Sequence, residues 1–175
     1  MTGYQQAILY LSGSQLGGRF CVRNVDRHYL DAVAELFPGV SVYLQRRERE
    51  GKRDFWCVKS SKVVKPRLDE VTDLFGFAQA MIELQSCLTV YVWHGGTRPS
   101  TRRRFTIWGA AGDLEFIQPI IPARQRPICP YRTNTGQTYS LAYQSKADIA
   151  AILDYFSATP NANAAVWNRW AEKLR

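Results

Sequence analysis

The hydrophobic and polar positions change period several times along residues 67–175, which predicts alternating helices and strands. The apolar stretch at 75–85 predicts a helix that runs directly into a strand at 88–93. A turn rich in glycine, proline and serine then leads to a second strand at 102–108. A further helix, two more strands and a closing helix at 148–156 complete the pattern.

The first third of the chain repeats much of this order. Short apolar runs predict strands at 7–12 and 19–23, joined by a turn. A helix is predicted at 26–37, and strands at 40–47 and 54–60 follow it. Another helix then leads into the second pattern.

The two patterns align through their hairpins. Residues 9–11 pair with 90–92, and the first predicted helix pairs with the one that begins near Asp113. A repeat of this length indicates two related halves. We therefore predict a truncated N-terminal half at 1–66 and a C-terminal half at 67–175, which together form one domain.

Composition narrows the class of protein and its compartment. The chain has 175 residues and no apolar run near the roughly 20 residues that span a bilayer, so we expect no membrane partner. Its start lacks the pattern of a secretory signal. The four cysteines lie far apart without a CxxC pair, which favours neither a zinc site nor a disulfide framework. We expect an intracellular protein, from a mitochondrion, a chloroplast or the bacterial cytoplasm.

The charges are unevenly distributed. The formal net charge is +8, and the basic residues gather at predicted hairpin tips and strands while acidic residues lie on predicted helices. Hairpin tips are often charged in soluble proteins, but arginine interleaved with aromatic residues favours a nucleic-acid surface. The residues predicted to bind nucleic acid are Arg19, Arg23, Tyr43, Arg46, Arg47, Arg49, Lys52, Arg53, Lys59, Lys62, Tyr91, Trp93, Arg98, Arg102, Arg103, Arg104, Arg124, Arg126 and Arg132.

The predicted strands have two chemically different faces. Along 88–93, leucine and two valines share one face, and threonine, tyrosine and tryptophan share the other. The strands at 102–108 and 40–47 alternate in the same way, with Val42 and Leu44 expected to point inward. Helices on one side of an antiparallel sheet leave its other side open. The open side is therefore expected to suit phosphates, base edges and stacking.

The order helix–strand–strand–helix–strand–strand–helix, given twice, resembles the LAGLIDADG homing endonuclease family. Residues 78–88 lie where the signature helix and its exit strand would be, and the runs at 145–156 and 166–170 are similar to the end of these domains. The resemblance implies an α+β fold of two pseudo-symmetric αββαββα-type halves. Their antiparallel sheets would form a concave, basic saddle on a nucleic-acid duplex. In the hairpin alignment, the first signature helix is missing.

The resemblance also implies an acidic residue at the C-terminal end of each signature helix, where two carboxylates hold divalent metal ions. In the second half this position falls on Gln85, whose neutral carbonyl is a poor ligand for Mg²⁺. Glu83 lies two residues earlier, about 200° around the helix, and would need a shift of register. In the first half the position falls near Tyr4 or, in a rival alignment, on Gly17. Neither alignment supplies a carboxylate.

These observations predict a non-catalytic nucleic-acid-binding protein without a cofactor. Structured RNA is favoured over DNA, as for a maturase-like intron-splicing helper or a ribonucleoprotein subunit such as a ribosomal protein. The alternatives are an active DNA endonuclease that uses Glu83 with Mg²⁺ and a scaffold that binds an acidic protein. Gly76 and Ala80 give one helix a face that permits close approach. A second protein, a second copy of the chain, RNA or the chain's own C-terminal helices are the candidate partners of that face.

Overall fold

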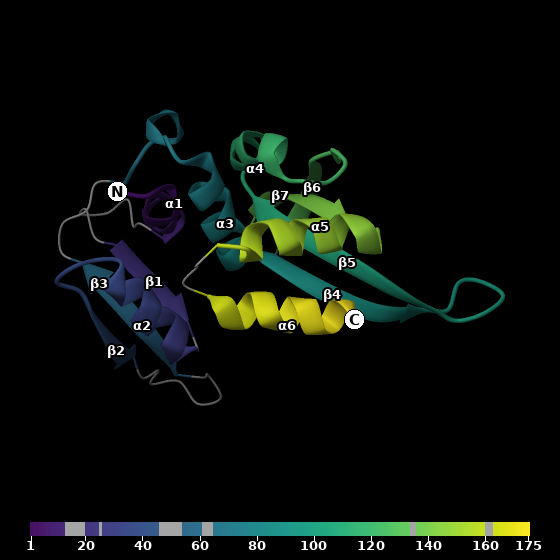
Figure 1. Cartoon of the computed structure of the whole chain (residues 1–175), viewed down its shortest axis with the longest axis horizontal. Coiled ribbons are helices and arrows are strands. Elements are labelled where there is room, and N and C mark those ends of the chain that lie inside the picture. Colours follow the sequence, from purple (N-terminus) through teal and green to yellow (C-terminus); the bar gives the residue numbers. More distant parts are fainter. Residues whose placement is uncertain (13–19, 25, 46–53, 61–64, 134–135, 160–162) are drawn as a thin grey trace. The chain divides into compact units, whose positions relative to one another are not determined.

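The computed structural model of the chain (Figure 1) describes residues 1–12, 20–24, 26–45, 54–60, 65–133, 136–159 and 163–175. The described residues form two compact units, Met1–Ala80 and Met81–Arg175, and each is treated by itself. The predicted repeats at 1–66 and 67–175 concern the sequence pattern, and that division stays a prediction. None of the described helices is both long enough and apolar enough to cross a membrane.

The N-terminal unit contains an antiparallel sheet with helix α2 on one of its faces. The described strands lie in the order β1-β3-β2. Tyr29, Leu30 and Val33 of α2 are buried, and Arg27 Cζ of the same helix lies 4.7 Å from the centre of the Trp56 ring of β3. The elements, including the helix that leads out of this unit, are α1 (Gly3–Ser12), β1 (Phe20–Asn24), α2 (Arg27–Glu35), β2 (Ser41–Gln45), β3 (Phe55–Ser60), η1 (Leu68–Glu70) and α3 (Leu74–Gln85).

The C-terminal unit contains an antiparallel sheet in the order β4-β5-β7-β6. Helix α6 lies over one face, since the Trp170 ring meets the buried Phe105 ring edge-on at 5.2 Å. Phe156 of α5 stacks on Trp167 of α6 and extends the same core. The elements are β4 (Ser86–Trp93), β5 (Ser100–Gly109), α4 (Ala111–Ile117), η2 (Gln118–Ile120), β6 (Cys129–Thr133), β7 (Gly136–Tyr143), α5 (Lys146–Ser157) and α6 (Ala164–Leu174).

The two units repeat one topology, which confirms the predicted α+β architecture. Strand β1 corresponds to β5, because each precedes a helix and pairs with the last strand of its sheet. The β2–β3 pair corresponds to β6–β7, and α2 corresponds to α4 as predicted. Among the described residues of the N-terminal unit, β4 has no counterpart.

The prediction of a strand at 7–12 is wrong, because these residues belong to helix α1. Ala7, Ile8 and Leu9 are all buried in succession, whereas a half-exposed strand would bury only alternate residues. Packing overrides the strand propensity of the sequence: the Tyr10 ring of α1 lies 5.8 Å from the Phe77 ring of α3. A helix therefore precedes the first sheet, and α1 corresponds to α3. The pairing of residues 9–11 with 90–92 is wrong for the same reason.

Part of the predicted inward face is exposed. Val90 and Val92 are 40% and 54% exposed, and Leu44 is 39% exposed, although each was expected to point into a core. Leu88 is buried opposite Phe105, but the β4–β5 hairpin continues past the helices beyond that point (Figure 1). Strand alternation therefore predicts the face of these residues correctly but not how far the covering helices reach.

A single carboxylate joins the starts of α1 and α3 in the N-terminal unit. Asp73 Oδ2 accepts a hydrogen bond from the Gly3 N–H at 3.0 Å, and its Oδ1 accepts one from the Gly76 N–H at 2.9 Å. A negative charge at two helix N-termini is favourable because each end carries unpaired N–H groups and a positive partial charge. The backbones lie so close here that a Cβ on Gly76 would stand 2.9 Å from the Tyr4 nitrogen.

Adding a methyl group at Gly3 is expected to disrupt this junction. In the Gly3→Ala variant the new Cβ would collide with the Asp73 backbone carbonyl oxygen, so the free energy of unfolding should fall by roughly 1–3 kcal/mol. Gly112→Ala is the matched control, because its Cβ meets nothing within 4 Å in helix α4. That variant should be about 0.5–1 kcal/mol more stable than the wild type. Urea unfolding measures both, and equal stability of the two variants would contradict the close approach.

Tyr143 provides a pH-dependent test of the C-terminal core. Burial, with a smaller contribution from Asp148, raises the pKa of this phenol from 10.0 to about 12, although Arg126 opposes the rise. Because folding favours the neutral phenol, its contribution to stability is complete below pH 10 and is lost as the pH rises through about 12. Tyr143→Phe should lose less stability than the wild type over that interval in alkaline unfolding curves. Parallel curves for the two proteins would contradict this assignment.

Candidate nucleic-acid interface

The sheet of the C-terminal unit has one face under helices and one face whose residues are largely exposed. Strand register assigns to the exposed face the residues that alternate with the buried Leu88, Phe105 and Leu141. We call this surface the C-terminal open face. Its residues are Cys87, Thr89, Tyr91, Trp93, Arg102, Arg104, Thr106, Trp108, Cys129, Tyr131, Ser140 and Ala142.

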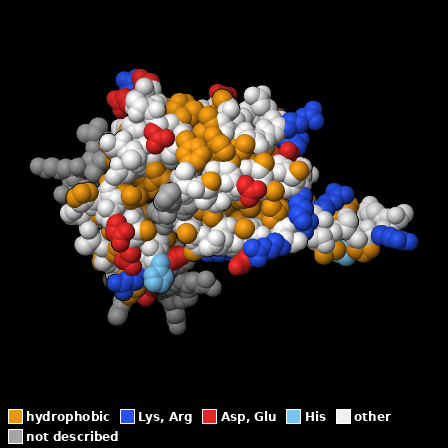
Figure 2. Space-filling model, viewed as in Figure 1, with side chains coloured by type: hydrophobic (Ala, Val, Ile, Leu, Met, Phe, Trp, Pro, Cys, Tyr) orange, Lys and Arg blue, Asp and Glu red, His pale blue; other side chains and the backbone are white. Residues whose placement is uncertain are grey.

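Aromatic and basic side chains meet on the β4–β5 hairpin, and the basic side chains of this hairpin (Figure 2) are all arginines. Tyr91 lies directly opposite Arg102 in the strand register, and Arg102 Cζ lies 4.6 Å from the centre of the Trp93 ring. Tyr91 and Trp93 are 36% and 42% exposed. An exposed ring with a guanidinium against it can stack on a base while the cation contacts a phosphate.

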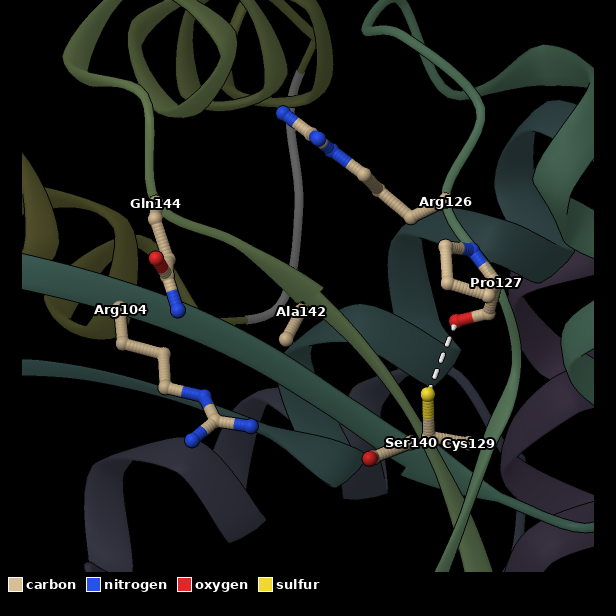
Figure 3. A pocket seen from close by; sticks show the side chains of 7 residues that line it. All are labelled: Arg104, Arg126, Pro127, Cys129, Ser140, Ala142 and Gln144. Carbon is tan, nitrogen blue, oxygen red and sulfur yellow. Dashed lines mark hydrogen bonds between the residues drawn. The ribbon is translucent and has the colours of Figure 1, made fainter.

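The same face contains a hollow of about 320 Å³. Arg104 and Gln144 line one side of it, and Cys129 and Ser140 line the other (Figure 3). The guanidinium and amide supply hydrogen-bond donors, and the amide and hydroxyl oxygens can accept, which suits a phosphate or the edge of a base. The full lining is Arg104, Arg126, Pro127, Cys129, Ser140, Ala142 and Gln144.

Several predicted arginines of this unit are paired with a carboxylate or lie outside the open face. Arg126 donates to Asp148 Oδ2 at 2.9 Å, and its side chain points away from Ser140 (Figure 3). Arg103 alternates with Arg102 and Arg104, so it lies on the helix-covered side. Arg132 likewise alternates with Tyr131 of the open face. The two remaining predicted residues, Arg98 and Arg124, are exposed in loops.

The N-terminal sheet has a corresponding face, opposite to the one that α2 covers. Lys59 Nζ lies 5.1 Å from the centre of the Tyr43 ring, and Arg23 Cζ lies 5.5 Å from that of Phe55. Interaction with the Tyr43 hydroxyl raises the pKa of Lys59, so this side chain stays a cation at neutral pH. We call this surface the N-terminal open face. Its described residues are Cys21, Arg23, Ser41, Tyr43, Phe55, Cys57 and Lys59.

The predicted basic hairpin tip at 46–53, together with Arg19 and Lys62, is not assigned to either face. The residues concerned lie outside the described part of the chain, as does Gly17 of the rival alignment. They are Arg19, Arg46, Arg47, Arg49, Lys52, Arg53 and Lys62.

The last described residues of α1 and α3 carry no carboxylate that could bind a metal ion. Tyr4 lies in the first turn of α1, so the hairpin alignment that put the acidic position near Tyr4 is wrong, and the last described residue of α1 is Ser12. Gln85 ends α3 as predicted. Glu83 is 6% exposed, and its Oε1 accepts a hydrogen bond from the Trp167 indole N–H of α6. Among the described residues, no group of three or more His, Cys, Asp or Glu side chains could hold a metal ion.

The small-residue face of α3 is occupied by the chain itself. Gly76 lies against the backbone of Tyr4 in α1, and Ala80 is fully buried. Sequence reasoning considered other partners for this face because it assigned residues 7–12 to a strand. At Gly76 the element that covers this face is helix α1.

Sequence reasoning also missed some open-face residues. Tyr131 is 52% exposed on β6, and the alternation of 129–133 was the signal that could have identified it. The sulfur atoms of Cys21 and Cys57 lie 3.4 Å apart. These two residues are 36 positions apart in sequence, so only the register of β1 and β3 brings them together.

Comparisons with known proteins agree with this architecture. No protein-family model and no curated protein sequence matches the chain. The solved structure of I-SmaMI bound to an uncleaved DNA target with calcium ions matches with a TM-score of 0.65, 8% identity, and coverage of 99% of this chain and 90% of that one. The LAGLIDADG meganuclease I-CpaMI bound to uncleaved DNA matches with a TM-score of 0.60 and 9% identity, over 98% of this chain and 88% of that one. The LAGLIDADG meganuclease I-AabMI bound to uncleaved DNA matches with a TM-score of 0.52 and 10% identity, over 89% of this chain and 79% of that one. The chain therefore has the fold of the LAGLIDADG homing endonucleases, as its sequence pattern predicted.

Proposed function

We propose that this chain binds a nucleic-acid duplex through the open faces of its sheets and does not cleave that duplex by metal-assisted hydrolysis. The observation that carries the proposal is a contrast. The open faces carry arginine, lysine and exposed aromatic side chains, while α3 ends at Gln85 and the last described residue of α1 is Ser12. The sheets therefore carry residues suited to binding nucleic acid, and the helix ends lack the carboxylates that would bind a metal ion.

The binding half of the proposal is supported by the arrangement of the side chains. Arg102 and Arg104 share a face with Tyr91 and Trp93, so phosphate contact and stacking are available on one surface. The similar structures named above are bound to DNA, so a DNA duplex is the first ligand to test. The RNA preference, together with the splicing and ribonucleoprotein roles that depend on it, has no support beyond the sequence and forms the second arm of the test.

The proposal that the chain does not cleave is supported by the donor atoms at the helix ends, which do not suit a metal ion. Mg²⁺ in proteins is bound through carboxylates and water. The Ser12 hydroxyl and the Gln85 amide are neutral, so the two helix ends do not fit the metal pair that the fold family implies. No hydrolytic step is derived through such a metal.

Glu83 is also unsuited to the alternative of an active endonuclease. Its carboxylate is buried and accepts from the Trp167 indole, and thus lies against α6. We therefore assign Glu83 a structural role, in which it holds α6 against the C-terminal end of α3.

Charge reversal on the open face should weaken binding. In the Arg102→Glu/Arg104→Glu variant two cations are replaced by anions, so affinity for a fluorescent DNA duplex should fall at least about tenfold, with a shallower dependence on salt. Arg169→Glu/Arg175→Glu is the matched control, because it changes the net charge equally at exposed positions in and just after α6. Fluorescence anisotropy measures both variants on DNA and on a folded RNA. Equal losses in the two variants would contradict a specific open face.

The wild-type protein should leave the bound duplex intact. We expect no discrete products on a denaturing gel after incubation with Mg²⁺, at concentrations where anisotropy shows the duplex to be bound. Ser12→Asp/Gln85→Asp tests the donor argument directly, since metal-dependent nicking that appears only in this variant would identify the missing ligands. Discrete cuts by the wild type that disappear in Glu83→Gln would instead support the endonuclease.

A further inference from the structure

The four cysteines of the chain all lie on the open faces. Cys21 and Cys57 belong to the N-terminal open face, and Cys87 and Cys129 belong to the C-terminal one. All are free thiols. The four therefore differ mainly in access and in their neighbours.

Cys21 and Cys57 form a contact pair. The β1–β3 register puts Cys21 opposite Lys59 and Cys57 opposite Arg23, so the two cysteines are diagonal neighbours on one face. Their sulfur atoms lie 3.4 Å apart. A disulfide bond is about 2.05 Å long, so a small adjustment of two adjacent strands is required to join the sulfurs.

The two thiols of the pair differ in access. Cys21 is partly exposed, whereas Cys57 is fully buried beneath its neighbours. A small molecule can therefore reach Cys21 first, and Cys57 is positioned to react with whatever Cys21 has bound. This is the arrangement of an attacking thiol and a resolving thiol.

Arg23 lies beside both sulfur atoms. The charge of Cys21, followed by a hydrogen bond with Cys57, raises the pKa of this guanidinium. Burial and contact with Cys57 raise the pKa of the Cys21 thiol, although Arg23 acts in the opposite direction. Modification of Cys21 should therefore be slow at neutral pH and should accelerate as the pH rises, because the thiolate is the reacting form.

We infer that Cys21 and Cys57 form a dithiol modification site for low-molecular-weight disulfides that carry carboxylate groups, and that its modification weakens nucleic-acid binding. The effect on nucleic-acid binding rests on the proposed function. The site lies between Arg23 and Lys59, the described cations of the N-terminal open face. A carboxylate-bearing adduct on Cys21 would pair with these cations and compete with phosphate.

The reaction balances as two thiol–disulfide exchanges. Cys21 loses its proton to solvent, and its sulfur attacks one sulfur of the small disulfide, which breaks that S–S bond and releases one small thiol after protonation. The Cys57 thiolate then attacks the Cys21 sulfur of the mixed disulfide. The Cys21–Cys57 bond forms, and the second small thiol leaves. The protein loses two hydrogen atoms, and the small disulfide is reduced to two thiols.

Oxidised glutathione is the probe, with intact-mass and peptide-mass analysis as the first readout. The wild type should yield a Cys21–Cys57 linked peptide, preceded by a glutathione adduct on Cys21. Cys57→Ser should stop at that adduct, because the resolving thiol is absent. The adduct should lower affinity for a DNA duplex at least about threefold, and dithiothreitol should restore it. Cys87→Ser/Cys129→Ser keeps the pair, so in the mass analysis it should yield the same Cys21–Cys57 linked peptide as the wild type.

The outcomes separate this inference from the proposed function. If the reduced wild type binds no nucleic acid, the proposed function fails, and the clause on binding fails with it, while the mass analysis still decides whether the pair is modified. If Cys87 and Cys129 react while Cys21 and Cys57 remain thiols, the modification site is overturned. If the reduced protein binds nucleic acid and an adduct on Cys21 leaves that affinity unchanged, the proposed effect of the modification on binding is overturned.

Discussion

The close approach of α1 and α3 is the constraint on which the N-terminal unit depends. Asp73 accepts hydrogen bonds from the Gly3 and Gly76 N–H groups, and neither glycine has a Cβ to hold the backbones apart. Two helix N-termini with positive partial charge can meet only because a carboxylate lies between them. The packing of Tyr10 on Phe77 follows from this junction and commits residues 7–12 to a helix.

The chemistry of the helix ends differs from that of the sheets. Ser12 and Gln85 supply neutral atoms at the ends of α1 and α3, and Glu83 holds α6 through Trp167. The open faces retain exposed rings and cations, such as Trp93 with Arg102. The chain shares its fold with DNA-bound meganucleases. The proposal that it binds without metal-assisted cleavage rests on this difference between the sheets and the helix ends.

The sequence predicted the order of most elements and the open faces, because alternation along a strand is a local property. Trp93 and Arg102 were assigned correctly on that basis. The helix at 7–12 was missed because its local propensity favours a strand, and only contact with α3 reverses that preference. The exposure of Val92 could not be predicted because it depends on where α6 ends. The contact between Glu83 and Trp167 could not be predicted because it depends on how α6 packs. The concave saddle stays a prediction.

Photochemical crosslinking of the wild type to a DNA duplex, with the crosslinked peptides identified by mass spectrometry, tests the central claim most directly. Exposed rings occur on both sides of the C-terminal unit: Tyr91, Trp93 and Tyr131 lie on the open face, and Tyr155 lies on α5. The account predicts crosslinks to the open-face rings and none to Tyr155. Crosslinks concentrated at Tyr155, with the open-face rings unmodified, would contradict it.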